Sequence, residues 1–582
     1  MRKILTKIKS NKIVLILFVS LILNIIGIFY AYPLMRLVGD EPAIMGATLK
    51  MINEFSLRPA FDDYYYLAPA VYIYLPFYLI YFALFFIFGI VHSVAELRTL
   101  VLLDYASLKM LVPIARLISI LISFLSVYLV YKTSRVLFKD NKVVALWSSF
   151  FTATSLIFVQ LSHFGRIWII QVLAVILGFY YLSLVLKEKK DSLNNYLISG
   201  FLIALSFGIH LVGIVLYPCF LFAHYSLNKG KGFVNIFIKN TKFWLANLAA
   251  LLSVVFIYLL HPNSFRHYFG LLRHYIFIGQ DNFNNFVSSS GKLSLADVSQ
   301  TPSFINSLKY FIPILFDWEP FLIILFLISL PILFLKQRKT FYFLSLFIVF
   351  YYLTIGPILK TTSPRYIVPL IPFLAIVAGY GLVYLTQFLK FKLIKRALLF
   401  LIILLFLYTP FCWSITLLKP NTFVLTKQWI EDNLPQGEKI INFGLDYRLT
   451  LNENKQTVVD ISKYTPELMG ARRRYLLNAA EEVYPQPNYY ILYRPSRRSQ
   501  EFLDKNQFNY LIIHWWDNER RQKLKEEIAL LDYQLELVQS FYPNESMADL
   551  TDLVNNMERP LWLLNNIQYT GPYVEIYMIS KL

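Results

Sequence analysis

The chain has 582 residues, of which 57% are hydrophobic and only 16% are charged, and its mean hydropathy is +0.52. A soluble protein of this length carries about a quarter charged residues, so the composition excludes an ordinary soluble protein and indicates an integral membrane protein. The whole chain has a net charge of +19. Residues 417–582 contain 19 Lys and Arg against 22 Asp and Glu, a net charge of −3, so the first 416 residues carry +22. Those basic residues lie in short clusters between apolar runs, a pattern that orients membrane helices rather than one that binds nucleic acid. The two cysteines, Cys219 and Cys412, indicate neither a disulfide framework nor a metal cluster.

An apolar run from Ile13 to about Ala31 follows a basic N-terminus and has no cleavage site after it, so we expect a retained first span that starts in the cytoplasm. Six basic clusters can all be placed on the cytoplasmic side. They are Arg2–Lys12, Lys132–Lys142, Lys187–Lys190, Lys229–Lys242, Lys336–Lys339 and Lys390–Arg396. About 11 spans follow, with the C-terminus outside: 13–31, 109–131, 143–161, 168–186, 196–209, 212–225, 243–261, 319–335, 341–358, 366–386 and 397–416.

Two segments must depart from simple spans for this topology to hold. Residues 70–91 are long enough to cross but would reverse the next basic cluster, so we expect them to lie along the outer leaflet as a juxtamembrane segment of the first outer loop. An ordinary span is the alternative. Residues 196–225 are basic at both flanks, which predicts two short helices joined near Gly208–Gly213, with His210 at the outer face.

The last part of the chain alternates between helical and strand patterns. A helix is predicted over 422–433, strands near 439–443, 488–493, 508–515, 535–541 and 573–579, and a charged helix over 518–531. We therefore divide the chain into a transmembrane domain, residues 1–416, and an extracytoplasmic α/β domain, residues 417–582.

In this topology the chemically varied residues gather on the outer face. Asp40 and Glu41 follow the first span directly. Two adjacent carboxylates at a membrane surface repel each other and lose water, which strengthens at least one of them as a general base. Solvated acids at the start of a helix near Pro42 are the alternative.

Basic side chains on the same face could bind a phosphate. Arg365 lies at the outer end of a late span, where a guanidinium can hold a phosphate or simply anchor the helix end. His163 and Arg166 occupy a short outer turn in which a lone histidine is more often a hydrogen-bonded cap than a ligand. Arg266 and Arg273 lie in an amphipathic stretch, residues 264–278, that could contact anionic lipid headgroups.

Nucleotide-driven chemistry has no support in the sequence. There is no Walker motif and no Gly-rich dinucleotide fingerprint, and no His, Asp and Glu spacing matches a metal site. If the protein is an enzyme with an outward site, lipid-linked substrates are the expected donors, because nucleotide sugars are scarce there.

Four local patterns together resemble the C superfamily (GT-C) of membrane glycosyltransferases, which includes protein O-mannosyltransferases and aminoarabinose transferases. The patterns are Gly39–Pro42, Gly200–Gly213, Ser363–Pro372, and Trp429–Gly437 followed by Gly571–Tyr577. The resemblance implies an inverting transfer from a polyprenyl-phosphate sugar to an acceptor protein, lipid or glycan at the outer face of the plasma (inner) membrane.

The resemblance also assigns roles to residues. The acid of the first outer loop matches Asp40, with Glu41 beside it, and the arginine that holds the leaving phosphate matches Arg365, with Arg166 and His210 as further phosphate-binding candidates. Many relatives carry a second acid in the turn that here reads Ser162–Arg166, so a divalent metal that bridges two acidic loops is possible but not indicated. Several relatives carry lysine at the position of His210.

Two other functions fit the same architecture. A transporter of lipid or polysaccharide should place polar residues through the middle of the bilayer, yet the spans contain few of them. A glycan polymerase or ligase would use an oligosaccharide on a diphosphate lipid instead of a monophosphate donor.

Overall fold

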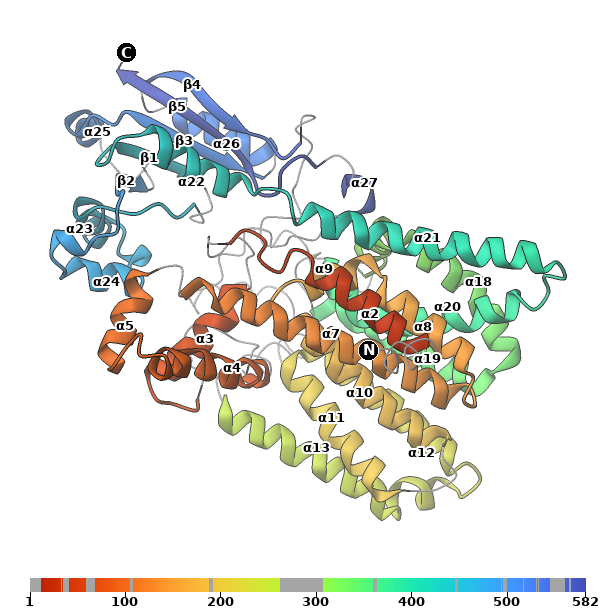
Figure 1. Cartoon of the computed structure of the whole chain (residues 1–582). Coiled ribbons are helices and arrows are strands. Elements are labelled where there is room, and N and C mark those ends of the chain that lie inside the picture. The colour runs from red at the N-terminus through yellow and green to blue at the C-terminus, as the bar shows by residue number, and fades with distance from the viewer. Residues whose placement is uncertain are drawn as a thin grey trace.

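The structure of the protein is a computed structural model. It describes residues 12–32, 34, 41–58, 68–104, 108–187, 192–261, 307–358, 364–444, 449–493, 495, 500–516, 518–529, 531, 533–544, 560–564 and 567–581. Long apolar helices form the first part of the chain, and a five-stranded sheet with helices around it forms the last part (Figure 1).

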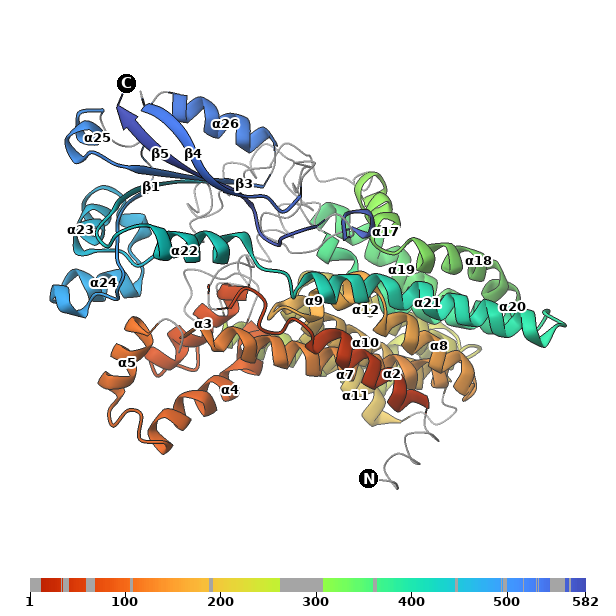
Figure 2. The same cartoon turned by 45° about the horizontal axis from the view of Figure 1, so that its top comes forward.

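The first part is a bundle of helices. In chain order these are α2 (Lys12–Ile25), α3 (Glu41–Asn53), α4 (Ala68–Ile87), α5 (Val94–Leu103), α7 (Leu111–Leu137), α8 (Lys142–Ala153), α9 (Leu156–Ser162), α10 (Ile167–Lys187), α11 (Leu193–Ile209), η1 (Leu211–Val215), α12 (Leu216–Leu227), η2 (Val234–Ile238), α13 (Thr241–Leu260), η3 (Ser307–Phe311), α17 (Ile312–Trp318), α18 (Pro320–Lys336), α19 (Arg338–Ile358), η4 (Pro364–Leu370), α20 (Ile371–Leu385) and α21 (Lys392–Thr416). Helices α3, α4 and α5 lie at the end of the bundle that the sheet also approaches (Figures 1 and 2). We call this the sheet-domain end.

The described residues confirm a helical protein that crosses the membrane several times. Six of their helices are long and apolar enough to span a bilayer, and up to eight spans result if each of two bent helix pairs counts as one. The predicted number of eleven is not confirmed. One reason is that α2 has only 14 helical residues before turns take over at Ile26.

The predicted break in residues 196–225 is confirmed. Helix α11 ends at Ile209, His210 adopts an extended conformation with φ −156° and ψ 141°, and η1 and α12 continue the chain. A Cβ atom on Gly213 would lie 2.3 Å from the backbone of Ser206, so the chain needs glycine where it turns back on itself.

A second break was not predicted. Residues 143–161, expected as one span, form α8 and α9, which are bent by 61°. Ser155 begins α9 as an N-cap residue, because its Oγ accepts a hydrogen bond from the Phe158 amide at 3.3 Å. The bend turns the far end of α9 toward α10.

Helix α4 contains most of the segment that was predicted to lie along the outer leaflet. Its buried residues follow a helical spacing and form one face: Ala70, Val71, Tyr74, Tyr78, Phe82 and Phe85. The Tyr78 hydroxyl donates a hydrogen bond to the Leu111 carbonyl at 3.1 Å, so α4 packs against the first turn of α7. The opposite face is apolar and exposed, as at Ile80 and Ile87. Because α4 is also long enough to cross a bilayer, the surface placement and the ordinary span both stay predictions.

The sheet follows the strands predicted for it. They are β1 (Lys439–Gly444), β2 (Tyr490–Tyr493), β3 (Tyr510–Trp515), β4 (Tyr533–Phe541) and β5 (Tyr573–Lys581), in the order β2-β1-β3-β5-β4. Strand β1 pairs in parallel with β2 and β3, and β5 pairs antiparallel with β3 and β4. The helices and turns of this domain are α22 (Thr422–Asn433), α23 (Lys455–Tyr464), η5 (Pro466–Leu468), α24 (Ala471–Leu477), η6 (Glu481–Val483), α25 (Gln500–Asn506), α26 (Asn518–Ala529) and α27 (Leu561–Leu564). The predicted helices over 422–433 and 518–531 correspond to α22 and α26.

The sheet domain is joined to the first helix as well as to the last one. The Ser414 hydroxyl of α21 donates to the Leu23 carbonyl of α2 at 2.7 Å. Asn421, the N-cap residue of α22, donates from its amide nitrogen to the Tyr30 hydroxyl at 2.8 Å. These contacts hold α22 beside the chain that leaves α2 (Figure 2).

Close packing of α11 against α13 predicts a large effect of one methyl group. A Cβ atom on Gly200 would lie 2.1 Å from the carbonyl oxygen of Ala246. We expect Gly200→Ala to force the two helices apart and to lower the free energy of unfolding by about 1–3 kcal/mol. Thermal unfolding of the purified protein in detergent measures this, with Gly470→Ala as the control because nothing lies within 4 Å of that position. Equal midpoints for the two variants would contradict the prediction.

Candidate active site

A buried ion pair joins the start of α3 to α7. The Arg116 guanidinium donates to both carboxylate oxygens of Glu41, from Nε at 2.9 Å and from Nη2 at 2.8 Å. Its Nη1 donates to the backbone carbonyls of Ile28 and Tyr30 at 3.0 and 2.7 Å. The two side chains are only 3% and 5% exposed. A buried charge pair needs this complete set of hydrogen bonds to offset its loss of water.

The turn between α9 and α10 closes onto this ion pair. The Gly165 amide donates to Oε1 of Glu41 at 2.9 Å, so both oxygens of that carboxylate are engaged. A Cβ atom on Gly165 would lie 2.6 Å from the Cβ atom of Ala115, which explains why glycine occupies the point where the turn meets α7. The turn that the sequence offered as a site therefore lies beside Glu41.

The two basic residues predicted in this turn are both buried. Nδ1 of His163 lies 2.7 Å from the Val159 carbonyl oxygen and Nε2 lies 2.9 Å from the Ile26 carbonyl oxygen, so the ring ties α9 to the end of α2. Arg166 is fully buried, with its guanidinium 5.6 Å from the centre of the Phe164 ring. This geometry favours the capping role for His163 and places Arg166 inside the protein.

A second cluster lies on the other side of the same turn. The Trp168 ring, in the first turn of α10, lies 4.8 Å from the His210 ring and 5.0 Å from the Tyr366 ring. The Arg365 guanidinium lies 5.3 Å from the centre of the Tyr366 ring. Two of the predicted phosphate-binding residues, Arg365 and His210, are thus brought together from segments that are 155 positions apart.

Three predicted residues lie outside the described residues: Asp40, Arg266 and Arg273. Asp40 directly precedes Glu41 in the chain. Among the described residues, no group of three or more His, Cys, Asp or Glu side chains is arranged to hold a metal ion.

Sequence reasoning missed Arg116, Gly165 and Trp168. A signal for Arg116 existed, because an arginine inside the predicted span 109–131 is costly in lipid unless it has a partner. Its partner Glu41 is 75 positions away, and no local pattern relates the two residues.

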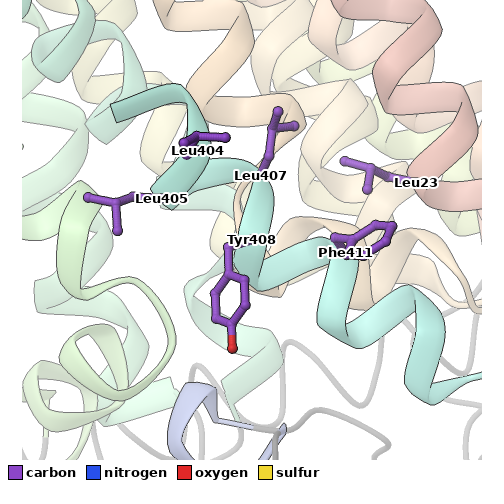
Figure 3. A pocket seen from close by; sticks show the side chains of 6 residues that line it. All are labelled: Leu23, Leu404, Leu405, Leu407, Tyr408 and Phe411. Atoms are coloured by element: carbon purple, nitrogen blue, oxygen red, sulfur yellow. The ribbon is translucent and has the colours of Figure 1, made fainter. Parts of the chain in front are cut away.

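An apolar pocket of about 450 Å³ lies between α2 and α21 (Figure 3). Its lining residues are Leu23, Leu404, Leu405, Leu407, Tyr408 and Phe411. Among them only Tyr408 carries a hydroxyl group, and the pocket lies on helices whose composition suits a bilayer, so lipid hydrocarbon is its natural surrounding.

Comparisons with known proteins agree with the predicted resemblance. Residues 113–260 match the family described as dolichyl-phosphate-mannose-protein mannosyltransferase. No curated protein sequence matches the chain. The resemblance to membrane glycosyltransferases is therefore confirmed over α7 to α13, the segment that contains Arg116, the α9–α10 turn and His210.

Solved structures of low identity also match the chain. The archaeal oligosaccharyltransferase AglB from Archaeoglobus fulgidus, in complex with an inhibitory peptide and a dolichol-phosphate, is 12% identical, with 93% of this chain and 74% of that chain covered and a TM-score of 0.48. ArnT from Cupriavidus metallidurans bound to undecaprenyl phosphate is 12% identical, with 97% and 96% covered and a TM-score of 0.46. The arabinofuranosyltransferase AftD from Mycobacteria is 12% identical, with 98% and 40% covered and a TM-score of 0.38.

Proposed function

We propose that the protein is a glycosyltransferase that moves a sugar from a polyprenyl-phosphate donor to a hydroxyl group of a protein, lipid or glycan, with inversion at the anomeric carbon. One observation carries the proposal: residues 163–168 contact Glu41 on one side, through Gly165, and Tyr366, the neighbour of Arg365, on the other, through Trp168. A base and a phosphate-binding cation are the two groups that such a transfer requires. The match of residues 113–260 to a family named for a dolichyl-phosphate sugar supports the same donor class.

The proposed reaction is a single displacement. The acceptor oxygen attacks the anomeric carbon from the face opposite the phosphate, its proton passes to the Asp40 carboxylate, and the bond between the anomeric carbon and the phosphate oxygen breaks. Polyprenyl phosphate leaves with the bonding electrons, and Arg365 stabilises the charge that it carries away. The His210 ring lies against Trp168, which also contacts Tyr366, the neighbour of Arg365, so we assign His210 to the same phosphate.

We assign different roles to the two neighbouring acids, Asp40 and Glu41. Glu41 accepts hydrogen bonds from Arg116 and Gly165 on both of its oxygens, which leaves it poorly placed to take a proton from an acceptor. We therefore assign the general base to Asp40 and a positioning role to Glu41.

The sheet-domain end of the bundle is the proposed outer face. Basic residues such as Lys187 and Lys339 lie at the opposite end, where Lys187 Nζ donates to Thr340 Oγ1 at 2.8 Å and Lys339 Nζ donates to the Leu186 carbonyl at 3.1 Å. By the positive-inside rule that end is expected to face the cytoplasm, which supports a topology with the N-terminus inside and the sheet domain outside the plasma membrane.

A transfer assay with defined donors tests this function. Purified protein is given labelled polyprenyl-monophosphate sugars, and in parallel an oligosaccharide on a polyprenyl diphosphate, with acceptor-containing membrane extract. We expect transfer from a monophosphate donor only. Transfer from the diphosphate donor alone would indicate a glycan polymerase or ligase. If no sugar is transferred but the protein in liposomes moves the unmodified lipid across the membrane, it would be a transporter.

The role of Arg365 makes a separate prediction. Arg365→Ala should lower the transfer rate on the order of 10²-fold, because a preorganised donor to the leaving oxygen is lost. Arg338→Ala, at the far end of α19, is the matched control and should leave the rate unchanged, since the Arg338 guanidinium lies over the Phe334 ring at the opposite end of the bundle. Equal rates for the two variants would remove Arg365 from the site.

A further inference from the structure

Glu319 is a buried carboxylate that the proposed reaction does not use. It lies between α17 and α18, is 5% exposed, and accepts a hydrogen bond from the Ser155 hydroxyl at 2.6 Å and from the Ile157 amide at 2.9 Å. No Lys, Arg or His within the described ranges forms an ion pair with Glu319, so hydroxyl and amide groups alone stabilise its charge. A buried carboxylate without a cation is costly and needs a reason to persist.

These hydrogen bonds cap the start of α9. The first amide groups of a helix have no acceptor within the helix, and here Glu319 supplies one for Ile157. Ser155 extends the arrangement, because its hydroxyl donates to Glu319 and accepts from the Phe158 amide. A side chain 162 positions away from Ile157 therefore completes the cap of α9.

The same carboxylate joins two helix breaks. Helices α8 and α9 are bent by 61° at Thr154 and Ser155, and helices α17 and α18 are bent by 117° at Glu319. A second contact lies beside the first, because the Trp318 indole donates to the Gln160 side-chain oxygen at 3.0 Å. Trp318 and Glu319, which are adjacent where α17 meets α18, thus hold both the start and the middle of α9.

The far end of α9 leads directly into the candidate site. It is followed by His163, which contacts the end of α2, and by Gly165, which binds Glu41. Trp168 then contacts Tyr366, the neighbour of Arg365. Any shift of α9 would move the acidic pair relative to the Arg365 cluster, and displacements of about 1 Å in such sites can cost 10²-fold in rate.

We propose that Glu319 is a positioning residue that fixes α9 and, through it, the turn on which the two halves of the site meet. The catalytic consequence rests on the proposed glycosyl transfer, whereas the positioning itself does not. Glutamine keeps the acceptor oxygen that Ser155 and Ile157 need, and alanine removes it. Asp317 is the matched control, because it is an exposed carboxylate two positions earlier in α17.

Hydrogen–deuterium exchange of purified protein measures the positioning without any activity. In Glu319→Ala we expect the amide of Ile157 to exchange about tenfold faster or more, because it loses its acceptor, while Glu319→Gln and Asp317→Ala exchange like the wild type. If Glu319→Ala is not recovered as folded protein, Ser155→Ala removes one of the two bridging groups and should speed exchange at Phe158 by at least about threefold. Unchanged exchange in whichever of these variants is recovered would overturn the proposal.

The transfer assay measures the consequence. With a polyprenyl-monophosphate sugar, Glu319→Ala should lose about tenfold or more in kcat with KM for the donor little changed, and Glu319→Gln should restore most of it. Equal losses in the glutamine and alanine variants would overturn the role as a hydrogen-bond acceptor. A wild-type protein that transfers no sugar would refute the proposed function, and the exchange measurement would still decide whether Glu319 holds α9.

Discussion

Asp40→Asn is expected to reduce glycosyl transfer by about 10²- to 10⁴-fold while leaving the thermal stability of the protein unchanged. Asparagine has the size and shape of aspartate but cannot accept the acceptor's proton, so only the chemical step should suffer. The measurement is the initial rate with saturating polyprenyl-monophosphate sugar, together with thermal unfolding of the same preparation in detergent.

The control for this variant is a carboxylate in the same region that lies away from the buried ion pair. Glu54 is exposed just after α3, and Glu54→Gln should transfer sugar at the wild-type rate. A rate for Asp40→Asn within a factor of about three of the wild type would exclude Asp40 as the general base, since general-base catalysis contributes far more than that.

Substitutions in the ion pair between Glu41 and Arg116 are expected to lower the stability of the protein instead. Arg116→Ala leaves the Glu41 carboxylate buried without its partner, and the loss of one member of such a pair costs about 3–5 kcal/mol of unfolding free energy. Glu41→Gln should also lower the free energy of unfolding, because Arg116 would then face a neutral amide. Thermal or denaturant-induced unfolding in detergent measures both effects.

A double-mutant cycle separates the pair from its surroundings. The variant that carries both Glu41→Leu and Arg116→Met should lose less unfolding free energy than the two single variants lose in sum, because no charge stays buried alone. Arg116→Lys is not a conservative control, since an ammonium group cannot match the two-pronged contact with Glu41 and the two backbone carbonyls at once. Additive losses would show that the two side chains do not depend on each other.

These two experiments also separate two residues that the sequence could only offer together. Asp40 and Glu41 are neighbours with the same charge, and nothing in the local pattern distinguishes a base from a structural anchor. The distinction comes from Arg116 and Gly165, which reach Glu41 from positions 75 and 124 residues away.

Local sequence patterns predicted those features of the fold that depend on neighbouring residues in the chain. The strands of the sheet were predicted because alternating apolar residues and flanking turn residues mark each one, and the break at His210 because basic flanks left too few residues for two full spans. The bend at Ser155 was missed because the acceptor that completes it, Glu319, lies 164 positions away. The predicted number of eleven spans is not confirmed, and hydropathy records length and composition but not where a helix ends, as α2 does at Ile25.

Tyr30 gives the sheet domain a direct influence over the acidic loop. Its backbone carbonyl accepts from Arg116, and its hydroxyl accepts from the amide of Asn421, the residue that begins α22. Through this one residue the sheet domain is joined to Arg116, the guanidinium partner of Glu41. A change at the start of α22 therefore reaches the buried ion pair through two hydrogen bonds.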